Sequence, residues 1–232
     1  PLPANLTVNN DLALGPASFF PGTLSARSFP GAGLNTGALV LTVTGNASVA
    51  TGLTLNAGTN AATGLSVGGN LTGAGTLAWG DTNISIAGSL TAGTLTPPTT
   101  NSRTLAVGGD WAVGSFVPNI RATVQFTGPG TVSASGFHNL TLTASSGTRT
   151  AAGDITVNGN LVINSGATLD MNGYSLTVTG TISGAGTLIG GSAVTVTGSM
   201  SVANYTATSG ETRVGGNWGV SGVFNPNGGD RK

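Results

Sequence analysis

Hydrophobic and polar residues alternate over short stretches of this chain, and each stretch is followed by a corner of small residues. In the clearest stretch, 176–182, Leu176 and Val178 point to one face and Thr177 points to the other. Gly180 then permits a turn before the chain heads inward again. This pattern predicts a half-buried β-strand that ends in a corner.

The same strand-and-corner unit recurs along the chain, at 6–12, 41–45, 65–71, 84–90, 105–111, 155–161, 194–200 and 212–218. Successive units begin 15 to 24 residues apart, if starts are set at Leu6, Leu24, Leu41, Leu65, Ile84, Leu105, Thr123, Leu140, Ile155, Leu176, Val194 and Thr212. A nearly constant step of this length is typical of a solenoid coil. We therefore predict an all-β, right-handed parallel β-helix (β-solenoid) of about twelve coils.

The predicted core is a column of inward side chains that stack from coil to coil. Its members are Leu41, Val43, Leu65, Val67, Trp111, Ile155, Val157, Leu176, Val178, Val194, Val196 and Trp218. The two tryptophans occupy positions that other units give to leucine or methionine, so we interpret them as core fillers of a wider coil.

A longer period lies above the short one. Residues 23–29 match 131–137 at an offset of 108, residues 70–77 match 181–188 at 111, and residues 107–111 match 214–218 at 107. The chain is therefore predicted to be one solenoid domain, 1–232, made of two tandem super-repeats of about 110 residues, 1–118 and 119–232.

The composition of the chain argues against two classes of partner, nucleic acids and membranes. Charged residues are 6% of the chain, seven basic and seven acidic, so we expect no nucleic-acid partner. No apolar run reaches the roughly 18 residues of a membrane span, so membrane insertion is not expected either. The chain has no cysteine and begins with Pro1, which we interpret as a mature or excised segment of an exported protein.

Candidate chemistry is sparse. The carboxylates occur singly, mostly beside Gly or Asn where they cap turns, at Asp11, Asp81, Asp110, Asp154, Asp170, Glu211 and Asp230. His138 is the single histidine, which leaves no partner for a catalytic triad or a multi-histidine metal site. We therefore predict no catalytic residues, no cofactor and no metal, and interpret the chain as a non-enzyme.

Some strands carry Thr-x-Thr pairs, which would form a flat hydroxyl array if they were stacked outward. These pairs are Thr42/Thr44, Thr141/Thr143, Thr177/Thr179 and Thr195/Thr197. Ice-binding solenoids use such an array, but Thr also simply suits the outer face of a strand. Ser66, Ala106 and Arg213 interrupt the row in equivalent coils.

Three stretches, 124–128, 137–142 and 214–228, resemble repeats of large secreted bacterial β-solenoid surface proteins of the adhesin and autotransporter-passenger kind. The resemblance covers most of the chain and is compositional as well as motif-based. It implies an extracellular or cell-surface location and a role in surface structure or adhesion, and it carries over no catalytic residue.

The first and last units have the ordinary coil pattern, so we expect bare ends that stack head to tail into a homopolymer. The predicted end residues are Leu6, Val8, Leu12, Val214, Trp218 and Phe224, and segments 1–5 and 225–232 could add strand pairing. The predicted function is thus an extracellular structural subunit of a surface filament. The alternative is an adhesin-like binding module of a larger surface protein, with a glycan, ice or another surface ligand as partner.

Overall fold

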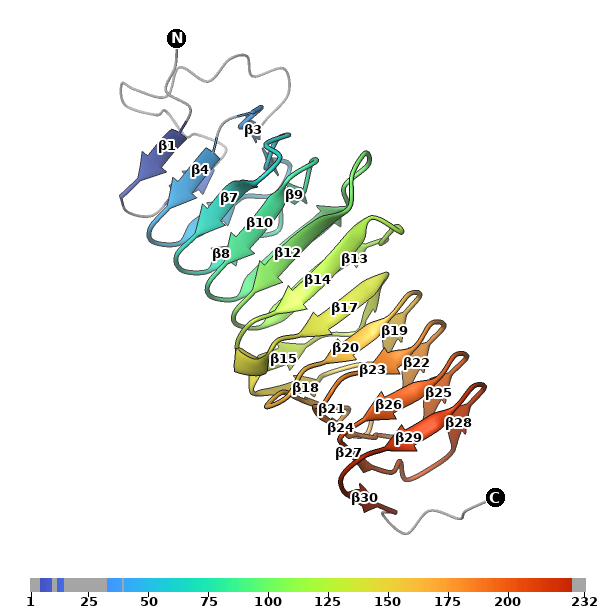
Figure 1. Cartoon of the computed structure of the whole chain (residues 1–232). Helices are drawn as coiled ribbons and strands as arrows, with labels where there is room; N and C mark the ends of the chain where they lie inside the picture. The colour runs from blue at the N-terminus through green and yellow to red at the C-terminus, as the bar shows by residue number, and fades with distance from the viewer. Residues whose placement is uncertain (1–4, 10–11, 15–32, 39, 227–232) are drawn as a thin grey trace. The chain divides into compact units, whose positions relative to one another are not determined.

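The computed structural model describes residues 5–9, 12–14, 33–38 and 40–226. Within these residues the chain is all-β, a parallel β-solenoid of about nine turns with three parallel sheets (Figure 1). The chain divides into two compact units. Unit 1 comprises 1–107 and 112–122, and unit 2 comprises 108–111 and 123–232.

Unit 1 is built from short parallel strands that stack in chain order. One sheet contains β1 (Asn5–Val8), β4 (Val40–Val43), β7 (Thr63–Val67), β10 (Asn83–Ile86) and β12 (Arg103–Val107). Another contains β2 (Leu12–Leu14), β5 (Ala47–Val49), β8 (Leu71–Thr72) and β11 (Leu90–Thr96). The long β11 also pairs with β9 (Thr76–Ala78), β9 pairs with β6 (Thr54–Asn56), and β6 pairs with β3 (Gly33–Asn35). Two further strands, β13 (Trp111–Phe116) and β14 (Ala122–Phe126), have residues in both units.

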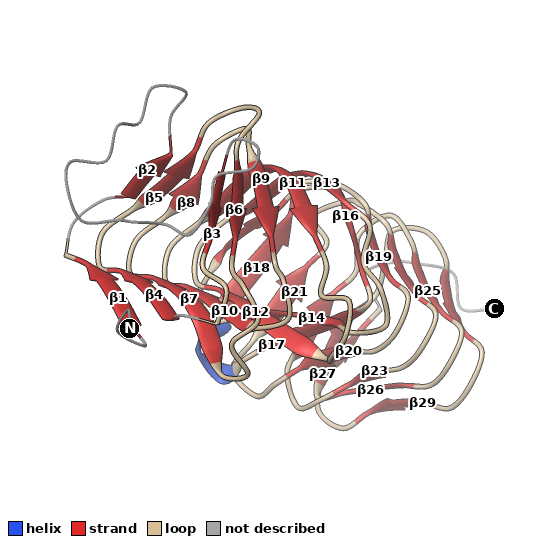
Figure 2. Ribbon diagram, turned by 90° about the horizontal axis from the view of Figure 1, so that it is seen from above, coloured by secondary structure: helices blue, strands red, loops and turns tan. Residues whose placement is uncertain are grey.

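Unit 2 has three strands in each turn. After β14, the first sheet continues with β17 (Asn139–Leu142), β20 (Leu161–Ile163), β23 (Ile182–Ser183), β26 (Met200–Val202) and β29 (Trp218–Val220), which follow one another side by side in Figure 2. The second contains β15 (Gly130–Val132), β18 (Thr148–Ala151), β21 (Thr168–Asp170), β24 (Thr187–Ile189), β27 (Asn204–Thr206) and β30 (Phe224–Asn225). The third contains β16 (Ser135–Phe137), β19 (Ile155–Val157), β22 (Leu176–Val178), β25 (Val194–Val196) and β28 (Thr212–Val214), and a single 3₁₀ turn, η1 (Ala144–Ser146), precedes β18.

The predicted facing of the strands is confirmed. In β22, Leu176 and Val178 are buried and Thr177 between them is exposed, as period two requires. The register also follows the prediction within each unit: Leu41 pairs with Leu65, and Leu176 pairs with Val194. Like residues therefore stack on like residues from turn to turn.

The predicted count of twelve coils is wrong. A constant step gives Leu140 and Ile155 equivalent positions in successive coils, but they lie in β17 and β19, two different sheets of one turn. Their true counterparts in the next turn are Leu161 and Leu176. The count overshoots because similar corner sequences occur at more than one corner of a turn. The coil start at Leu24 lies outside the described residues.

One turn geometry occurs in both units and requires glycine. Gly73 and Gly184 have φ of 132° and 120°, and a Cβ on either would lie 2.1 Å from a backbone carbonyl oxygen of the preceding turn. Two residues on, the N–H of Gly75 donates to Val49 O (3.0 Å) and that of Gly186 donates to Ile163 O (2.8 Å). These glycines let consecutive turns approach backbone to backbone.

Candidate assembly surface

The predicted core column is buried with one exception. Leu41, Val43, Leu65, Val67, Trp111, Ile155, Val157, Leu176, Val178, Val194 and Val196 are all at most 1% exposed. Trp218 is 48% exposed and is therefore not a core residue in this structure, which corrects its assignment to the column. It belongs to the last described turn of unit 2, where no described residue covers it.

An aromatic layer interrupts the aliphatic column of unit 2. The ring centroid of Trp111 lies 6.1 Å from that of Phe126 and 5.3 Å from that of Phe137, and the two phenylalanines are 6.1 Å apart. These are edge-on and tilted contacts, the geometry that aromatic quadrupoles favour. The indole Nε1 of Trp111 donates to Ser135 Oγ at 3.1 Å, so its one polar atom is satisfied.

Arg149 lies entirely inside this layer. Its guanidinium stands 4.1 Å above the ring of Phe126, and Nη1 donates to the carbonyl oxygen of Gly109. The side chain passes Gly130, its register partner in β15, where a Cβ would lie 3.1 Å from Nη1. Burial lowers the pKa of Arg149 to about 10, and the charge of Asp110 opposes part of that change.

Sequence reasoning missed Arg149, although a signal was present. In β18, period two places Arg149 on the same face as Ala151, and both are buried. An arginine on an inward face, one turn after the small residue Gly130, indicates a buried charge that needs room.

Corner Asn and Asp side chains form what we call the corner ladder, in which a side-chain oxygen accepts a hydrogen bond from a backbone N–H of the following turn. Its steps include Asn70 N to Asn46 (2.8 Å), Ser89 N to Asn70 (2.8 Å), Thr131 N to Asp110 (2.7 Å), Asn160 N to Asn139 (3.1 Å), Ser175 N to Asp154 (2.8 Å), Thr181 N to Asn160 (3.0 Å) and Val223 N to Asn204 (3.0 Å). The ladder satisfies corner amides that the sheets do not reach.

The ladder corrects two interpretations of the corner residues. Asp110 and Asp154 cap the next turn, whereas Asp170 caps its own turn through Asn172 N (2.8 Å), as predicted.

Gly180 is required because the backbone of the preceding turn lies very close to it: a Cβ there would lie 2.4 Å from Gly159 O and 2.5 Å from Asn160 Oδ1. Hydrogen bonds from Thr131 N and Oγ1, together with the charge of Arg149, hold the pKa of Asp110 below 3.8.

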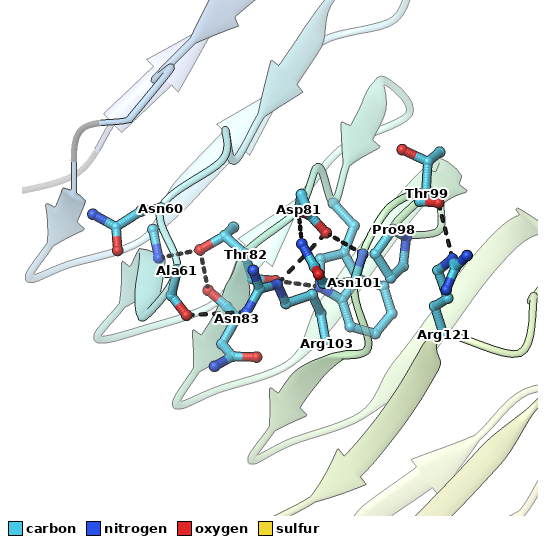
Figure 3. Close-up of polar contacts among 12 residues, drawn as sticks. Asn60, Ala61, Asp81, Thr82, Asn83, Pro98, Thr99, Asn101, Arg103 and Arg121 are labelled. Atoms are coloured by element: carbon cyan, nitrogen blue, oxygen red, sulfur yellow. Dashed lines mark hydrogen bonds and ion pairs between the residues drawn. The ribbon is translucent and has the colours of Figure 1, made fainter.

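A polar corner in unit 1 connects successive loops (Figure 3). Asn101 donates to Asp81 from its backbone N–H (2.8 Å) and its side-chain amide, and Arg103 Nε lies 3.6 Å from Asp81 Oδ1. Arg103 Nη1 also donates to Ala61 O at 3.0 Å. Desolvation raises the pKa of Asp81, but these hydrogen bonds and the Arg103 charge together lower it below 3.8.

The polar corner extends to a neighbouring loop in the same way. Arg121 Nε donates to Thr99 O at 2.9 Å (Figure 3). Asn119 Nδ2 donates to Pro98 O at 2.7 Å. These side chains bind backbone carbonyls of adjacent loops. The arrangement therefore fastens loop to loop and gathers no second carboxylate for acid–base chemistry.

Across the described part of the chain, no three His, Asp or Glu side chains come together as a metal-binding group. Nor does any helix in that part have the length and apolar character of a membrane span. The outward Thr row of unit 2 is short: Thr156, Thr177 and Thr195 stack in register, with Gly136 at one end and Arg213 at the other.

The last turn of unit 2 exposes apolar side chains. Trp218 forms an aromatic cluster with Tyr205 (5.9 Å) and Phe224 (5.7 Å), but Tyr205 is buried whereas Trp218 and Phe224 are 48% and 36% exposed. Val223 beside them is 66% exposed, and Val214 is half-buried. We call Val214, Trp218, Val223 and Phe224 the terminal face.

Hydrogen bonds fix the base of the terminal face. The Tyr205 hydroxyl lies 2.6 Å from Thr212 Oγ1, and burial raises the pKa of that tyrosine. Strands β28 and β29 are the last of their sheets, each paired with one neighbour among the described residues. The face thus combines apolar area with strand edges.

The opposite predicted end is described in part. Leu6 lies in β1 and pairs with Leu41, Val8 is half-buried, and Leu12 is 5% exposed. The side chain of Leu6 and segments 1–4 and 227–232 lie outside the described residues.

Comparison of the chain with protein-family models, curated proteins and solved structures finds no match. The β-solenoid fold therefore rests on the structure itself, and the resemblance to adhesins and autotransporter passengers stays a prediction.

Proposed function

We propose that this chain is an extracellular structural protein whose copies stack head to tail into a surface filament. In this proposal the solenoid is right-handed, the usual hand of parallel strand crossovers, and its two tandem super-repeats act as one subunit. The single observation that carries the proposal is the terminal face, where Trp218 is 48% exposed on a turn of the same kind as those buried beneath it.

The energetics favour covering this face. Aromatic side chains bury about 150–250 Å² each, so covering the exposed half of Trp218 alone contributes about 2–3 kcal/mol. Phe224 and Val223 add apolar area, and strand edges offer directional pairing. A contact between unlike ends does not close on itself, so it generates a filament.

The experiment compares the chain with two variants over a rising concentration series, by sedimentation velocity and negative-stain microscopy. Trp218→Asp places a charge on the terminal face and should abolish filaments while leaving circular dichroism unchanged. Val117→Asp changes a 78% exposed apolar residue in a loop of unit 1 and should assemble normally. A parent chain that stays monomeric at high concentration refutes the proposal.

The extracellular location has a separate test. Antibodies raised against the chain should label intact cells of the source organism, and protease added outside the cells should remove the signal. Labelling only of permeabilised cells would contradict the extracellular location, and it would leave the result of the assembly experiment unaffected.

A further inference from the structure

Two Asn-Gly pairs, 158–159 and 172–173, lie in the described part of the chain. In this dipeptide an asparagine side chain reacts readily with the backbone that follows it, because glycine has no Cβ to hinder the approach of its nitrogen. Both asparagines are exposed. The two pairs differ in how the structure holds the glycine nitrogen.

The pair 172–173 forms a tight turn between β21 and β22. Tyr174 N donates to Met171 O at 2.8 Å, and the two residues between them have φ of 47° for Asn172 and 85° for Gly173. Positive φ at both central residues is the mark of a type I′ turn, which favours Asn-Gly. A Cβ on Gly173 would meet no atom within 4 Å, so the turn faces open space.

The groups that would react in this turn are held weakly. Within the described residues, the N–H of Gly173 makes no hydrogen bond. The side-chain amide of Asn172 donates to Ala151 O at 3.3 Å, which is long for such a bond. The Gly173 nitrogen and the Asn172 side-chain carbon are thus adjacent in sequence and exposed to water.

The pair 158–159 is fixed inside the stack of turns. Gly159 N donates to His138 O at 2.7 Å, and Gly159 O accepts from Gly180 N at 3.0 Å. A Cβ on Gly159 would lie 2.5 Å from Asn139 Oδ1. Attack by this nitrogen therefore requires the turn to open first.

We propose that Asn172–Gly173 is a site of spontaneous deamidation in the folded protein, with solvent water as co-reactant. The nitrogen of Gly173 attacks Cγ of Asn172 and forms a C–N bond, while the bond from Cγ to Nδ2 breaks. Nδ2 leaves as ammonia and takes the proton of the Gly173 N–H. Water then opens the cyclic imide at either carbonyl, which gives aspartate or isoaspartate without any oxidation or reduction.

The site lies against the next turn, so the modification should weaken stacking. Tyr174 O accepts from Ser192 N at 3.1 Å, and a Cβ on Gly191 would lie 2.0 Å from the same oxygen. Isoaspartate lengthens the backbone just before Tyr174. The isoaspartate form, separated by ion exchange, should therefore melt at a lower temperature than Asn172→Asp, which adds the same charge to a backbone of normal length. Equal melting would overturn this consequence.

The site itself is tested by incubating the folded chain at mildly alkaline pH in water enriched in heavy oxygen. Peptide mapping by tandem mass spectrometry follows Asn172 and Asn158 separately. Asn172 should react at least about tenfold faster, because Asn158 reacts only from an opened turn. In guanidinium chloride neither glycine is held, and the two rates should become similar.

Labelling by an isoaspartyl methyltransferase gives a second readout on matched variants. All of them carry Asn227→Gln, which removes a third Asn-Gly pair outside the described residues. Asn172→Gln disfavours the five-membered imide and should remove the labelling of the folded protein, whereas Asn158→Gln should keep it, both with unchanged circular dichroism. Three results would overturn the proposal: equal rates at Asn172 and Asn158 in the folded chain, labelling that Asn158→Gln abolishes, or an Asn172 that stays intact when folded while the unfolded chain converts.

Discussion

Replacing Arg149 with methionine tests whether the buried charge stabilises unit 2. The substitution removes the guanidinium and its hydrogen bond to Gly109 O, and it keeps a long side chain above the ring of Phe126. Methionine fills irregular core space and makes favourable sulfur–aromatic contacts. The packing change is therefore small, and the measured difference reports on the charge.

The magnitude follows from the pKa of Arg149. The lowering of the pKa of Arg149 to about 10 means that the folded protein disfavours the charged form by about 3 kcal/mol at neutral pH. Against this, loss of the guanidinium leaves Gly109 O without that donor, which costs about 1–3 kcal/mol. We expect Arg149→Met to lie between no change and about 2 kcal/mol of added stability, as for other buried charges replaced by apolar residues.

Equilibrium unfolding in guanidinium chloride, followed by fluorescence and circular dichroism, measures the effect. Arg149→Ala is the packing control and should be about 2–5 kcal/mol less stable than Arg149→Met, because it leaves a cavity. If Arg149→Met is destabilised by more than about 2 kcal/mol at an unchanged m-value, contacts with Gly109, Phe126 and Asp110 outweigh desolvation and the reasoning is refuted.

The pH dependence gives an independent check. The folded pKa of Arg149, about 10, is lower than the unfolded one, so in a window that opens near pH 10 the unfolded chain binds more protons at this residue than the folded chain. The stability of the parent should therefore rise relative to Arg149→Met across this window. Tyr205, whose pKa is raised by burial, is present in both proteins and cancels in the comparison.

Three further predictions concern the column, a corner and the ladder. Val178→Asp should lower stability by about 4 kcal/mol or more, because it buries an unpaired charge, whereas Thr177→Asp on the exposed face of the same strand should change circular dichroism and melting little. Gly184→Ala should destabilise by more than the roughly 1–3 kcal/mol of backbone strain, since its Cβ meets a carbonyl oxygen at 2.1 Å; Gly173→Ala, with φ of 85° and open space, should show the strain alone. Because the pKa of Asp110 is lowered on folding, the parent should lose stability as the pH falls below 3.8, and Asp110→Asn should lose less in acid melting curves.

The local pattern of hydrophobic and polar residues predicts most of the fold. Period two alone predicts which side chains of β22 and β25 point inward, because each residue's face depends on its immediate neighbours. The number of turns depends on which corner a motif forms, and that is not local. Thr-Gly-Thr after Val178 joins the third sheet to the first in unit 2, whereas Gly-Gly-Asn after Val67 joins the first sheet to the second in unit 1.

The parts of the candidate site that lie in a repeated unit could be predicted from the sequence. The parts that depend on a small residue or a backbone group in another turn could not. Trp218 and Phe224 were predicted at an end because they sit in the last coil pattern. Arg149 was missed because its burial depends on Gly130 one turn earlier and on a carbonyl two turns earlier. Likewise, Asp154 caps an amide 21 residues along, a contact that no short window of sequence contains.

The corner ladder gives the solenoid a direction. In each of the steps named above, the oxygen belongs to the earlier turn and the N–H to the later one. Through these side-chain oxygens, a turn offers acceptors to the next turn, while the backbone N–H of a neighbouring corner residue donates forward, as Ala47 N does to Asn70 O (2.8 Å). In the proposed head-to-tail stack, a ladder step between copies therefore joins a side-chain acceptor of one copy to a backbone donor of the next, whereas a face-to-face contact would bring the same half of the step together twice.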